Sequence, residues 1–300
     1  MSTLQSLSDN IAEIVEQSGK AIVSINGNRR FSPSGIHWHK SIIVTSDESI
    51  KRYEEITITL DNGHKKPASL LGRDPSTDVA VFQIENPDIP VATIGEAVNL
   101  KVGNLVLALA RSNEGDIRAA MGAVSVVGGE WQSMYGGKID QFIRPDISLY
   151  PGFGGGALVD ASGNIIGMNT TGRRGTALTI PASTINRVVE QLLSKGRIPR
   201  GYLGLGMQPV RLPDNLKNSL NLTSNGGVIV VNVEPNSAAE KAGIFLGDIL
   251  VSFDGNTVED TSDILALLNE SFRVGESVKT KIVRGGELVE LNLTVGERVV

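Results

Sequence analysis

The chain contains no cysteine, and this absence excludes several kinds of site together. Without thiols there is no disulfide bridge, no thiolate metal centre and no cysteine nucleophile, and a chain of 300 residues needs no bridge to fold. Basic residues are not in excess either. The formal net charge is −5, so nucleic acid is not expected as a partner. No run of roughly 18 apolar residues occurs, so no membrane-spanning helix is expected.

Residues 1–20 also lack a cationic segment followed by a continuous apolar stretch, which is the pattern of an export signal. If Met1 is the native start, the sequence predicts a cytoplasmic protein. If a signal or an anchor has been removed, the same sequence would belong to a periplasmic or membrane-associated protein.

Length and apolar content indicate two domains, because 300 residues exceed one average domain and 40% apolar residues suffice for a core in each. From residue 21 to about 179, short apolar or alternating runs are separated by Gly, Pro and Asn. This pattern is typical of an all-β sandwich or barrel, or of two barrels in series. The expected strands are 21–25, 41–45, 56–60, 79–84, 105–110, 122–127, 157–159, 165–169 and 177–180.

Helical spacing precedes and follows this β region. Apolar residues three and four apart predict a helix over 4–18 that ends at Gly19, and a second helix after Pro181 that ends at Gly196, with Ser183 or Thr184 as its N-cap. A short Pro- and Gly-containing connection then predicts domains 1–198 and 199–300. The second would be a small α+β domain with strands 227–233, 249–253, 278–284 and 288–295 and helices 237–242 and 262–270.

The stretch 146–160 is built like the nucleophile loop of a serine protease that lacks the serine. Its run of Gly152, Gly154, Gly155 and Gly156 lets the backbone take positive φ and turn its N–H groups to one side, as an oxyanion hole requires. A hydroxyl or thiol is expected where Gly154 stands. The loop therefore keeps the form of an oxyanion site without its nucleophile.

Motifs along nearly the whole chain resemble the HtrA/Deg family of serine proteases, in order and in spacing. The segments that resemble its chymotrypsin-like domain are 45–48, 74–81, 122–125, 143–159, 165–169 and 177–181, and those that resemble its PDZ domain are 200–204, 235–243 and 247–255. The resemblance implies a mainly β fold, with two six-stranded β-barrels of the chymotrypsin/trypsin type followed by one small α+β PDZ module. It also implies a trimer formed through the protease domains, to which the N-terminal helix would contribute.

The same resemblance places the family's histidine, aspartate and serine at Glu48, Asp78 and Gly154. Phe153 and Ala157 stand where the family has Asn and Pro. A triad needs an imidazole to take and return the proton of the hydroxyl, and an aspartate to orient the imidazole. A carboxylate is a weak base at neutral pH unless burial raises its pKa, and glycine has no proton to give. We therefore expect no catalytic residue among these degenerate positions. We expect the protein not to be an enzyme, apart from residual hydrolase activity.

Three interpretations of Asp78 and Glu48 remain open at this point. In the first, Asp78 is a hydrogen-bonded structural remnant and Glu48 is a partly solvated replacement. In the second, the two carboxylates share a proton or bind a cation. In the third, they form a dyad that activates water.

Other candidates find no partner in the sequence. Three hydroxyl side chains close to the loop, those of Ser148, Thr170 and Thr171, have no histidine at the family's base position. His37 and His39 would share a strand face, which allows a metal pair, but no third ligand is nearby and no metal or cofactor is expected. The pairs 29–30 and 173–174, both Arg-Arg, are surface turns or contacts for an acidic partner.

The C-terminal half keeps the parts of a peptide-binding module. Tyr202, Leu203, Gly204 and Leu205 resemble the carboxylate-binding loop of HtrA-type PDZ domains, whose backbone N–H groups receive a C-terminal carboxylate. The apolar side of the helix at 262–270 would line the adjacent groove, through Ile264, Leu265 and Leu268. A peptide would add as a strand, with an apolar last residue in the pocket. The alternative is that these apolar side chains are only core.

The sequence therefore predicts a catalytically inactive HtrA-like pseudoprotease that scaffolds, sequesters or regulates polypeptides. Its partners would be C-terminal tails at the PDZ groove and extended segments at the old protease cleft. Two other classes stay open: an endopeptidase with an unorthodox site, and a structural assembly protein whose PDZ-like groove is closed.

Overall fold

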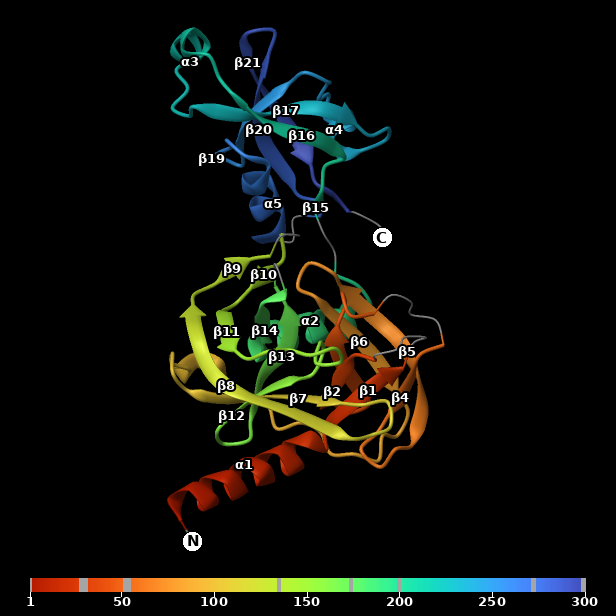
Figure 1. The fold of residues 1–300 in the computed structure, drawn as a ribbon. Helices are drawn as coiled ribbons and strands as arrows, with labels where there is room; N and C mark the ends of the chain where they lie inside the picture. The colour runs from red at the N-terminus through yellow and green to blue at the C-terminus, as the bar shows by residue number, and fades with distance from the viewer. Residues whose placement is uncertain are drawn as a thin grey trace. The chain divides into compact units, whose positions relative to one another are not determined.

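The computed structural model describes residues 2–26, 32–50, 55–133, 136–172, 175–198, 201–270 and 274–297. The chain forms two compact units, Met1–Ile198 and Pro199–Val300 (Figure 1). The predicted fold class is confirmed: two closed six-stranded barrels are followed by a PDZ-like β domain.

The first barrel closes in the strand order β1-β2-β3-β6-β5-β4. Its interior is filled by β-branched and aromatic side chains such as Ile43, Ile58 and Phe82, which are fully buried. Such side chains pack well on a pleated sheet, so the apolar alternation of the sequence is enough to fix which face turns inward. The strands are β1 (Ile22–Asn26), β2 (Ser34–His39), β3 (Ile42–Ser46), β4 (Thr57–Thr59), β5 (Lys65–Asp74) and β6 (Val79–Ile84).

The second barrel closes in the order β11-β14-β13-β12-β7-β8. Its core includes Leu158, Ile166 and Phe153, and Phe153 belongs to the glycine-rich loop. The strands are β7 (Leu105–Arg111), β8 (Ile117–Gly128), β11 (Phe142–Asp146), β12 (Ala157–Asp160), β13 (Ile165–Thr171) and β14 (Ala177–Pro181). A short pair, β9 (Trp131–Gln132) and β10 (Lys138–Ile139), and a 3₁₀ turn, η1 (Ala97–Asn99), complete the connections.

The described residues of the first unit include two α-helices. In α1 (Thr3–Gly19), Ile11, Ile14 and Val15 pack against the barrel core, whereas Leu4 and Leu7 of the expected apolar stripe are exposed. Figure 1 shows the N-terminal end of α1 projecting from the barrels. The second helix, α2 (Ala182–Lys195), ends at Gly196 in the left-handed conformation, as predicted. Its N-cap is Pro181 and not Ser183 or Thr184, because the Thr184 hydroxyl accepts the backbone N–H of Asp140 instead.

The second unit is a sheet in the order β16-β17-β18-β20-β21, so β16 lies at one edge. Its strands are β16 (Leu205–Arg211), β17 (Gly226–Val233), β18 (Ile249–Phe253), β20 (Ser277–Arg284) and β21 (Glu287–Thr294), with β19 (Asn256–Thr257) on β18 and a separate pair, β15 (Gly201–Tyr202) and β22 (Gly296–Glu297). The helices are α3 (Asp214–Leu220), α4 (Ala238–Lys241) and α5 (Thr261–Glu270). No helix among the described residues of the chain has the length and apolarity that crossing a bilayer requires.

Candidate functional site

Asp78 lies at the start of β6 and is one of few non-glycine residues with a positive φ, +58°. Its carboxylate accepts hydrogen bonds on both oxygens. The backbone N–H of Glu48 donates to Oδ1 over 2.7 Å, the Ser46 hydroxyl lies 2.8 Å from Oδ2, and the Thr170 hydroxyl also donates to Oδ2. A strained backbone held by so many contacts is the kind of outlier that gathers at functional sites.

The pKa of Asp78 is raised above its ordinary value, because burial disfavours the charged carboxylate. The hydrogen bonds from the Glu48 N–H, Thr170 and Ser46 act in the opposite direction, since they stabilise the anion, but they do not outweigh burial. The nearby charge of Glu48 adds to the rise. A carboxylate in this state holds and releases protons closer to neutral pH than a solvated one does.

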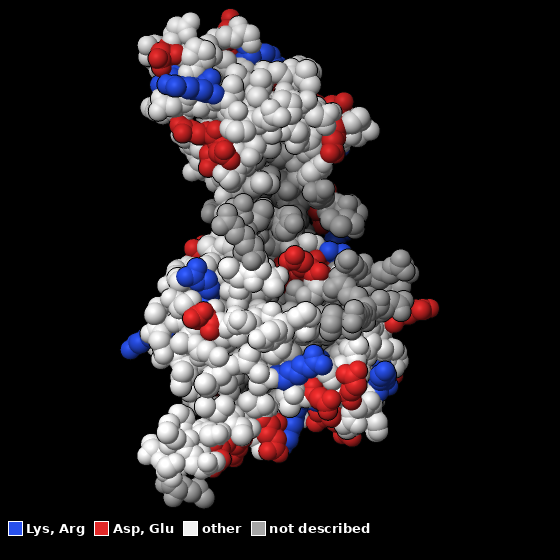
Figure 2. Space-filling view, in the orientation of Figure 1, with Lys and Arg blue, Asp and Glu red and all other residues white. Residues whose placement is uncertain are grey.

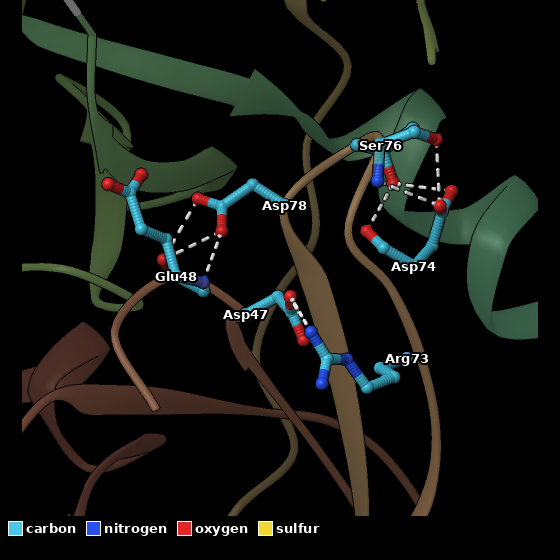
Figure 3. A network of polar contacts seen from close by, with 8 residues as sticks. Asp47, Glu48, Arg73, Asp74, Ser76 and Asp78 are labelled. Atoms are coloured by element: carbon cyan, nitrogen blue, oxygen red, sulfur yellow. Dashed lines mark hydrogen bonds and ion pairs between the residues drawn. The ribbon is translucent and has the colours of Figure 1, made fainter. Parts of the chain in front are cut away.

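Glu48 is exposed, and only its backbone reaches Asp78. In Figure 3 a dashed line joins the Glu48 N–H to Asp78, and none joins the two carboxylates. A shared proton needs two carboxylates in hydrogen-bond contact away from water, so this geometry favours Asp78 as a hydrogen-bonded group with a solvated neighbour. The adjacent Asp47 is buried and paired with Arg73 over 2.7 Å.

The glycine-rich loop is fixed from two sides. The Ser34 hydroxyl donates to the Gly152 carbonyl over 2.8 Å, and the Ser34 N–H donates to the Gly154 carbonyl over 3.0 Å. On the other side Phe153 is buried in the second barrel, at the position where the family has Asn. Gly152 and Gly155 take positive φ values of +100° and +80°, so the sequence-based expectation of a positive-φ turn applies to these two glycines.

Gly154 differs from the glycines beside it, since it is not among the residues with positive φ. A Cβ atom added there would lie 2.5 Å from the Ser49 hydroxyl oxygen, and no backbone atom of the other described residues beyond its two chain neighbours would lie within 4 Å of it. Ser49 in turn donates to the Ser46 hydroxyl over 3.0 Å. Sequence reasoning missed Ser46 and Ser49, although both lie within two residues of the family's base position.

Of the three hydroxyl residues near the loop, the fold brings one to Asp78. Thr170 on β13 is buried and donates to the carboxylate. Ser148 and Thr171 are exposed. Thr170 is therefore placed as a partner of Asp78.

His37 and His39 do not form the metal pair that their spacing allows. A bulge in the β2–β3 pairing lies between them, so His37 is buried while His39 is exposed. The Nδ1 atom of His37 lies 2.9 Å from the Pro90 carbonyl oxygen, and its buried Nε2 atom has no hydrogen-bond partner in the part of the chain that the structure describes. Among the described residues, no three His, Asp or Glu side chains gather where they could hold a metal ion.

Acidification is expected to destabilise the first unit through His37. Burial lowers the pKa of His37 below 6.5, so the unfolded chain takes up its proton at a higher pH than the folded chain. The contribution of neutral His37 to the free energy of unfolding is therefore complete above about pH 6.5 and is lost as pH falls through the lowered pKa. The free energy of unfolding should change by at most about 1.4 kcal/mol per pH unit in this range. Urea midpoints across this range test it. His37→Gln should flatten the slope and the exposed-site control His39→Gln should not; equal slopes in wild type and His37→Gln would contradict the expectation.

The two Arg-Arg pairs, 29–30 and 173–174, lie outside the described residues. Over the described surface seen in Figure 2, acidic and basic side chains are interspersed between broad uncharged areas.

In the second unit, residues 202–205 span the last residue of β15, the two-residue connection and the first residue of the edge strand β16. Gly204 has a φ of +74°, and a Cβ atom there would overlap the Cβ of Ser237. Its carbonyl accepts the Glu234 N–H over 2.9 Å, the Leu203 carbonyl accepts the Ala239 N–H over 3.0 Å, and the Tyr202 hydroxyl donates to Glu234 over 2.5 Å. The turn is thus held by the segment that leads into α4.

The predicted groove residues divide between core and surface. Leu203, Ile264 and Leu268 are buried in the core of the second unit. Leu265 on α5 is 45% exposed and Leu205 is half-buried. The core alternative therefore holds for three of these side chains, and two remain at the surface. A separate depression of about 540 Å³ lies beside Tyr202, lined by residues 234–238, 241–242, 292 and 294–297 and by no residue of α5.

Both units match known domain families. Residues 33–168 match the trypsin-like peptidase domain family and residues 201–295 match the PDZ domain family. A probable periplasmic serine endoprotease, DegP-like, from Chlamydia pneumoniae is 30% identical over 264 residues, which are 85% of this chain and 52% of that protein. The chain spans about half the length of the curated relatives it matches.

Two solved structures match nearly the full chain. The serine endoprotease from Yersinia pestis is 26% identical with a TM-score of 0.75, covering 96% of this chain and 98% of that one. The HtrA-type protease AlgW with a tripeptide is 26% identical with a TM-score of 0.72, covering 96% and 97%.

The expectation that this chain is not an enzyme is wrong by this comparison, because the relatives that it matches are named serine endoproteases. The side chains at the triad positions still differ from those of a serine protease. Gly154 and Glu48 cannot act as the serine and histidine of a Ser-His-Asp triad, so hydrolysis by this chain would have to use other groups.

Proposed function

Because the chain joins a trypsin-like peptidase domain to a PDZ domain and is homologous to the DegP/HtrA serine endoproteases, we propose that it recognises polypeptides by their free C-terminal carboxylate. The turn at residues 202–205 would receive the carboxylate. The functional domains would be residues 1–198 and 199–300.

The observation that carries this proposal is the free edge of β16. Among the described strands, β16 pairs with β17 along one side of the sheet and with no strand along the other, and α5 contacts it. An unpaired edge presents backbone N–H and C=O groups to which an extended peptide adds as a further strand. The left-handed turn at Gly204 ends directly at Leu205, the first residue of this edge, so the last peptide residue would meet the turn.

Side chains at the surface of this region supply the apolar contacts. Leu205 and Met207 on β16 are half-buried against the core, and Leu265 on α5 is exposed. Ile264 and Leu268 would support them from the core below. An apolar last residue of the peptide would remove part of this surface from water, at about 25 cal/mol per Å² of apolar area buried.

Peptide titration tests the proposal. A fluorescent peptide ending in valine with a free carboxylate should bind about tenfold to a hundredfold more tightly than its C-terminal amide, because hydrogen bonds to a charged group contribute about 1.5–3 kcal/mol. Leu265→Glu should weaken binding of the free acid. Leu288→Glu, at an exposed leucine on the opposite edge strand β21, is the matched control and should not. Equal binding of acid and amide would refute carboxylate capture.

A second candidate function is peptide-bond hydrolysis in the trypsin-like unit, which the names of the relatives favour. Casein digestion by the full chain, read by mass spectrometry, tests it: specific new termini that persist through repurification support hydrolysis, and their absence opposes it. The relatives are named periplasmic, so we propose the periplasm as the compartment, and the cytoplasmic alternative has no support among them. Assembly as a trimer stays a prediction from the family resemblance.

A further inference from the structure

We propose that Ser49 is a nucleophile of the trypsin-like unit, connected through the Ser46 hydroxyl to Asp78 as its base. The proposal rests on the second candidate function, hydrolysis in this unit, and is independent of peptide capture by the PDZ domain. It assigns the reacting hydroxyl to a residue outside the family's triad positions.

The first observation is the place that the Ser49 hydroxyl occupies. Its oxygen lies 2.5 Å from the point where a Cβ atom on residue 154 would stand, so it lies next to the site of the family's missing nucleophile. Glycine at 154 leaves this space open, and the Ser49 hydroxyl fills it. The side chain is half-buried, so its hydroxyl is not fully enclosed by the protein.

The second observation is a continuous hydrogen-bonded chain from Ser49 to a carboxylate. Ser49 donates to Ser46 over 3.0 Å, and the Ser46 hydroxyl lies 2.8 and 3.0 Å from the two oxygens of Asp78. Ser46 is fully buried at the end of β3, so its hydroxyl is held in place. A nucleophile within hydrogen-bond reach of a group that leads its proton to a base is the arrangement that activates a hydroxyl.

The third observation concerns the base and the loop beside it. The remaining hydrogen bonds of Asp78 come from the Glu48 N–H and Thr170, which fix the carboxylate toward Ser46. Burial raises the pKa of Asp78, which makes its carboxylate a stronger base than a solvated one. The glycine-rich loop packs on the same turn: a Cβ atom on Gly155 would lie 3.0 Å from the Ser46 N atom.

The reaction balances with the peptide and one water molecule as its reactants. The Ser49 oxygen bonds to the carbonyl carbon of the scissile peptide as its proton passes to Ser46 and the Ser46 proton passes to Asp78. The bond from carbon to nitrogen then breaks as Asp78 returns its proton through the Ser46 hydroxyl to the leaving nitrogen, because the Ser49 oxygen now carries the acyl group. Water repeats the two steps on the acyl-Ser49 ester and regenerates the free hydroxyl.

Labelling of the full chain with a fluorophosphonate probe tests the assignment without needing a substrate. Peptide mapping should locate the phosphonyl adduct on Ser49. Ser49→Ala should remove this adduct, and Ser46→Ala should slow labelling about a hundredfold, the usual contribution of a positioned base. The labelling rate of wild type should rise with pH as Asp78 ionises, and Asp78→Asn should abolish that rise. Ser148→Ala, at an exposed serine near the loop, is the control and should label as wild type does.

Gly154→Ala gives a second test that leaves Ser49 itself unchanged. The added methyl would push the Ser49 hydroxyl from its place, so labelling should fall while the thermal unfolding midpoint stays close to that of wild type. Absence of a Ser49 adduct on folded wild-type protein, or an unchanged labelling rate in Ser46→Ala, would overturn the proposal. Casein digestion is a separate measurement: a Ser49 adduct without new casein termini refutes hydrolysis of proteins and leaves the nucleophile assignment standing.

Discussion

Replacement of Gly155 by alanine is expected to destabilise the trypsin-like unit by about 2–5 kcal/mol, from positive-φ strain of about 1–2 kcal/mol and overpacking of about 1–3 kcal/mol. Gly155 has a φ of +80° and is buried. A methyl group there would collide with the Ser34 carbonyl and the Thr45 hydroxyl, which already hydrogen-bond to each other over 2.7 Å. Neither neighbour has room to move, because one is backbone and the other is buried.

Urea unfolding followed by tryptophan fluorescence measures this effect, since Trp38 and Trp131 both belong to the first unit. Gly154→Ala is the matched control, one residue away in the same loop. Its backbone is not in the left-handed region and it meets only the Ser49 side chain, so a loss of no more than about 1 kcal/mol is expected. Equal losses in the two variants would show that the loop yields to added volume and that the contacts of Gly155 do not hold it.

The contrast between these glycines shows what the sequence leaves undetermined in the loop. A run of glycines predicts backbone freedom, and Gly152 and Gly155 use it. The sequence does not distinguish Gly154 from them, because what stands opposite Gly154 is the Ser49 side chain, more than a hundred residues earlier in the chain. Glycine at position 154 leaves space for the Ser49 hydroxyl, and the backbone conformation there does not require glycine.

The same limit applies to the fold. Strands with continuous apolar runs, such as β6 and β7, were predicted within about one residue of their ends. Strands β5 and β16 were missed: Pro67 and Pro209 interrupt them, and their mixed polar character gives little periodicity. They form because neighbouring strands offer unpaired backbone groups, which a barrel or a sheet edge satisfies whatever the side chains are.

In the candidate site, the family resemblance found Asp78 and left its partners unknown. Two of these, Ser46 and the Glu48 N–H, come from the end of β3, and Thr170 comes from the other barrel. Contacts between barrels depend on how the two sheets close and not on local pattern. The resemblance also led to the expectation of an inactive protein from two changed side chains, which the comparison with named endoproteases corrects.

Asp248→Ala is expected to destabilise the PDZ domain by about 1–3 kcal/mol, the cost of leaving hydrogen-bond donors without their acceptor, because the Arg284 side chain of this ion pair is 34% exposed and can be hydrated. Arg284 donates to both oxygens of Asp248, over 2.8 and 2.7 Å, and the Phe245 N–H donates to one of them over 2.7 Å. The Asp248 side chain is 3% exposed and the Arg284 side chain 34% exposed. In the variant the Phe245 N–H would lose its side-chain acceptor, whereas Arg284 would keep the Gly243 carbonyl and its contact with water. The Arg284 guanidinium also lies over the Phe245 ring, 4.5 Å from its centre.

The pKa of Asp248 adds a pH test of the same contact. Burial pushes this pKa up, but the hydrogen bonds from Arg284 and Phe245 outweigh burial and the pKa is lowered from 3.8. The stability it contributes is therefore complete above about pH 4 and is lost as pH falls through the lowered pKa. The wild-type domain should lose this contribution to its stability below about pH 4. The variant Asp248→Ala lacks the carboxylate, so its stability should not show this loss.

Hydrogen exchange of the full chain measures the stability change where it occurs. The Val230 N–H donates to the Asp248 carbonyl and the Gly247 N–H donates to the Val230 carbonyl, so amides around β17 report on this part of the sheet. Asp214→Ala is the control, because Asp214 is 85% exposed and lies 3.8 Å from its partner Lys217; a loss below about 1 kcal/mol is expected. Exchange in Asp248→Ala no faster than in this control would mean that Arg284 finds new acceptors when Asp248 is removed. The packing of Arg284 on Phe245, and not the ion pair, would then be what holds β20 against the turn that precedes β18.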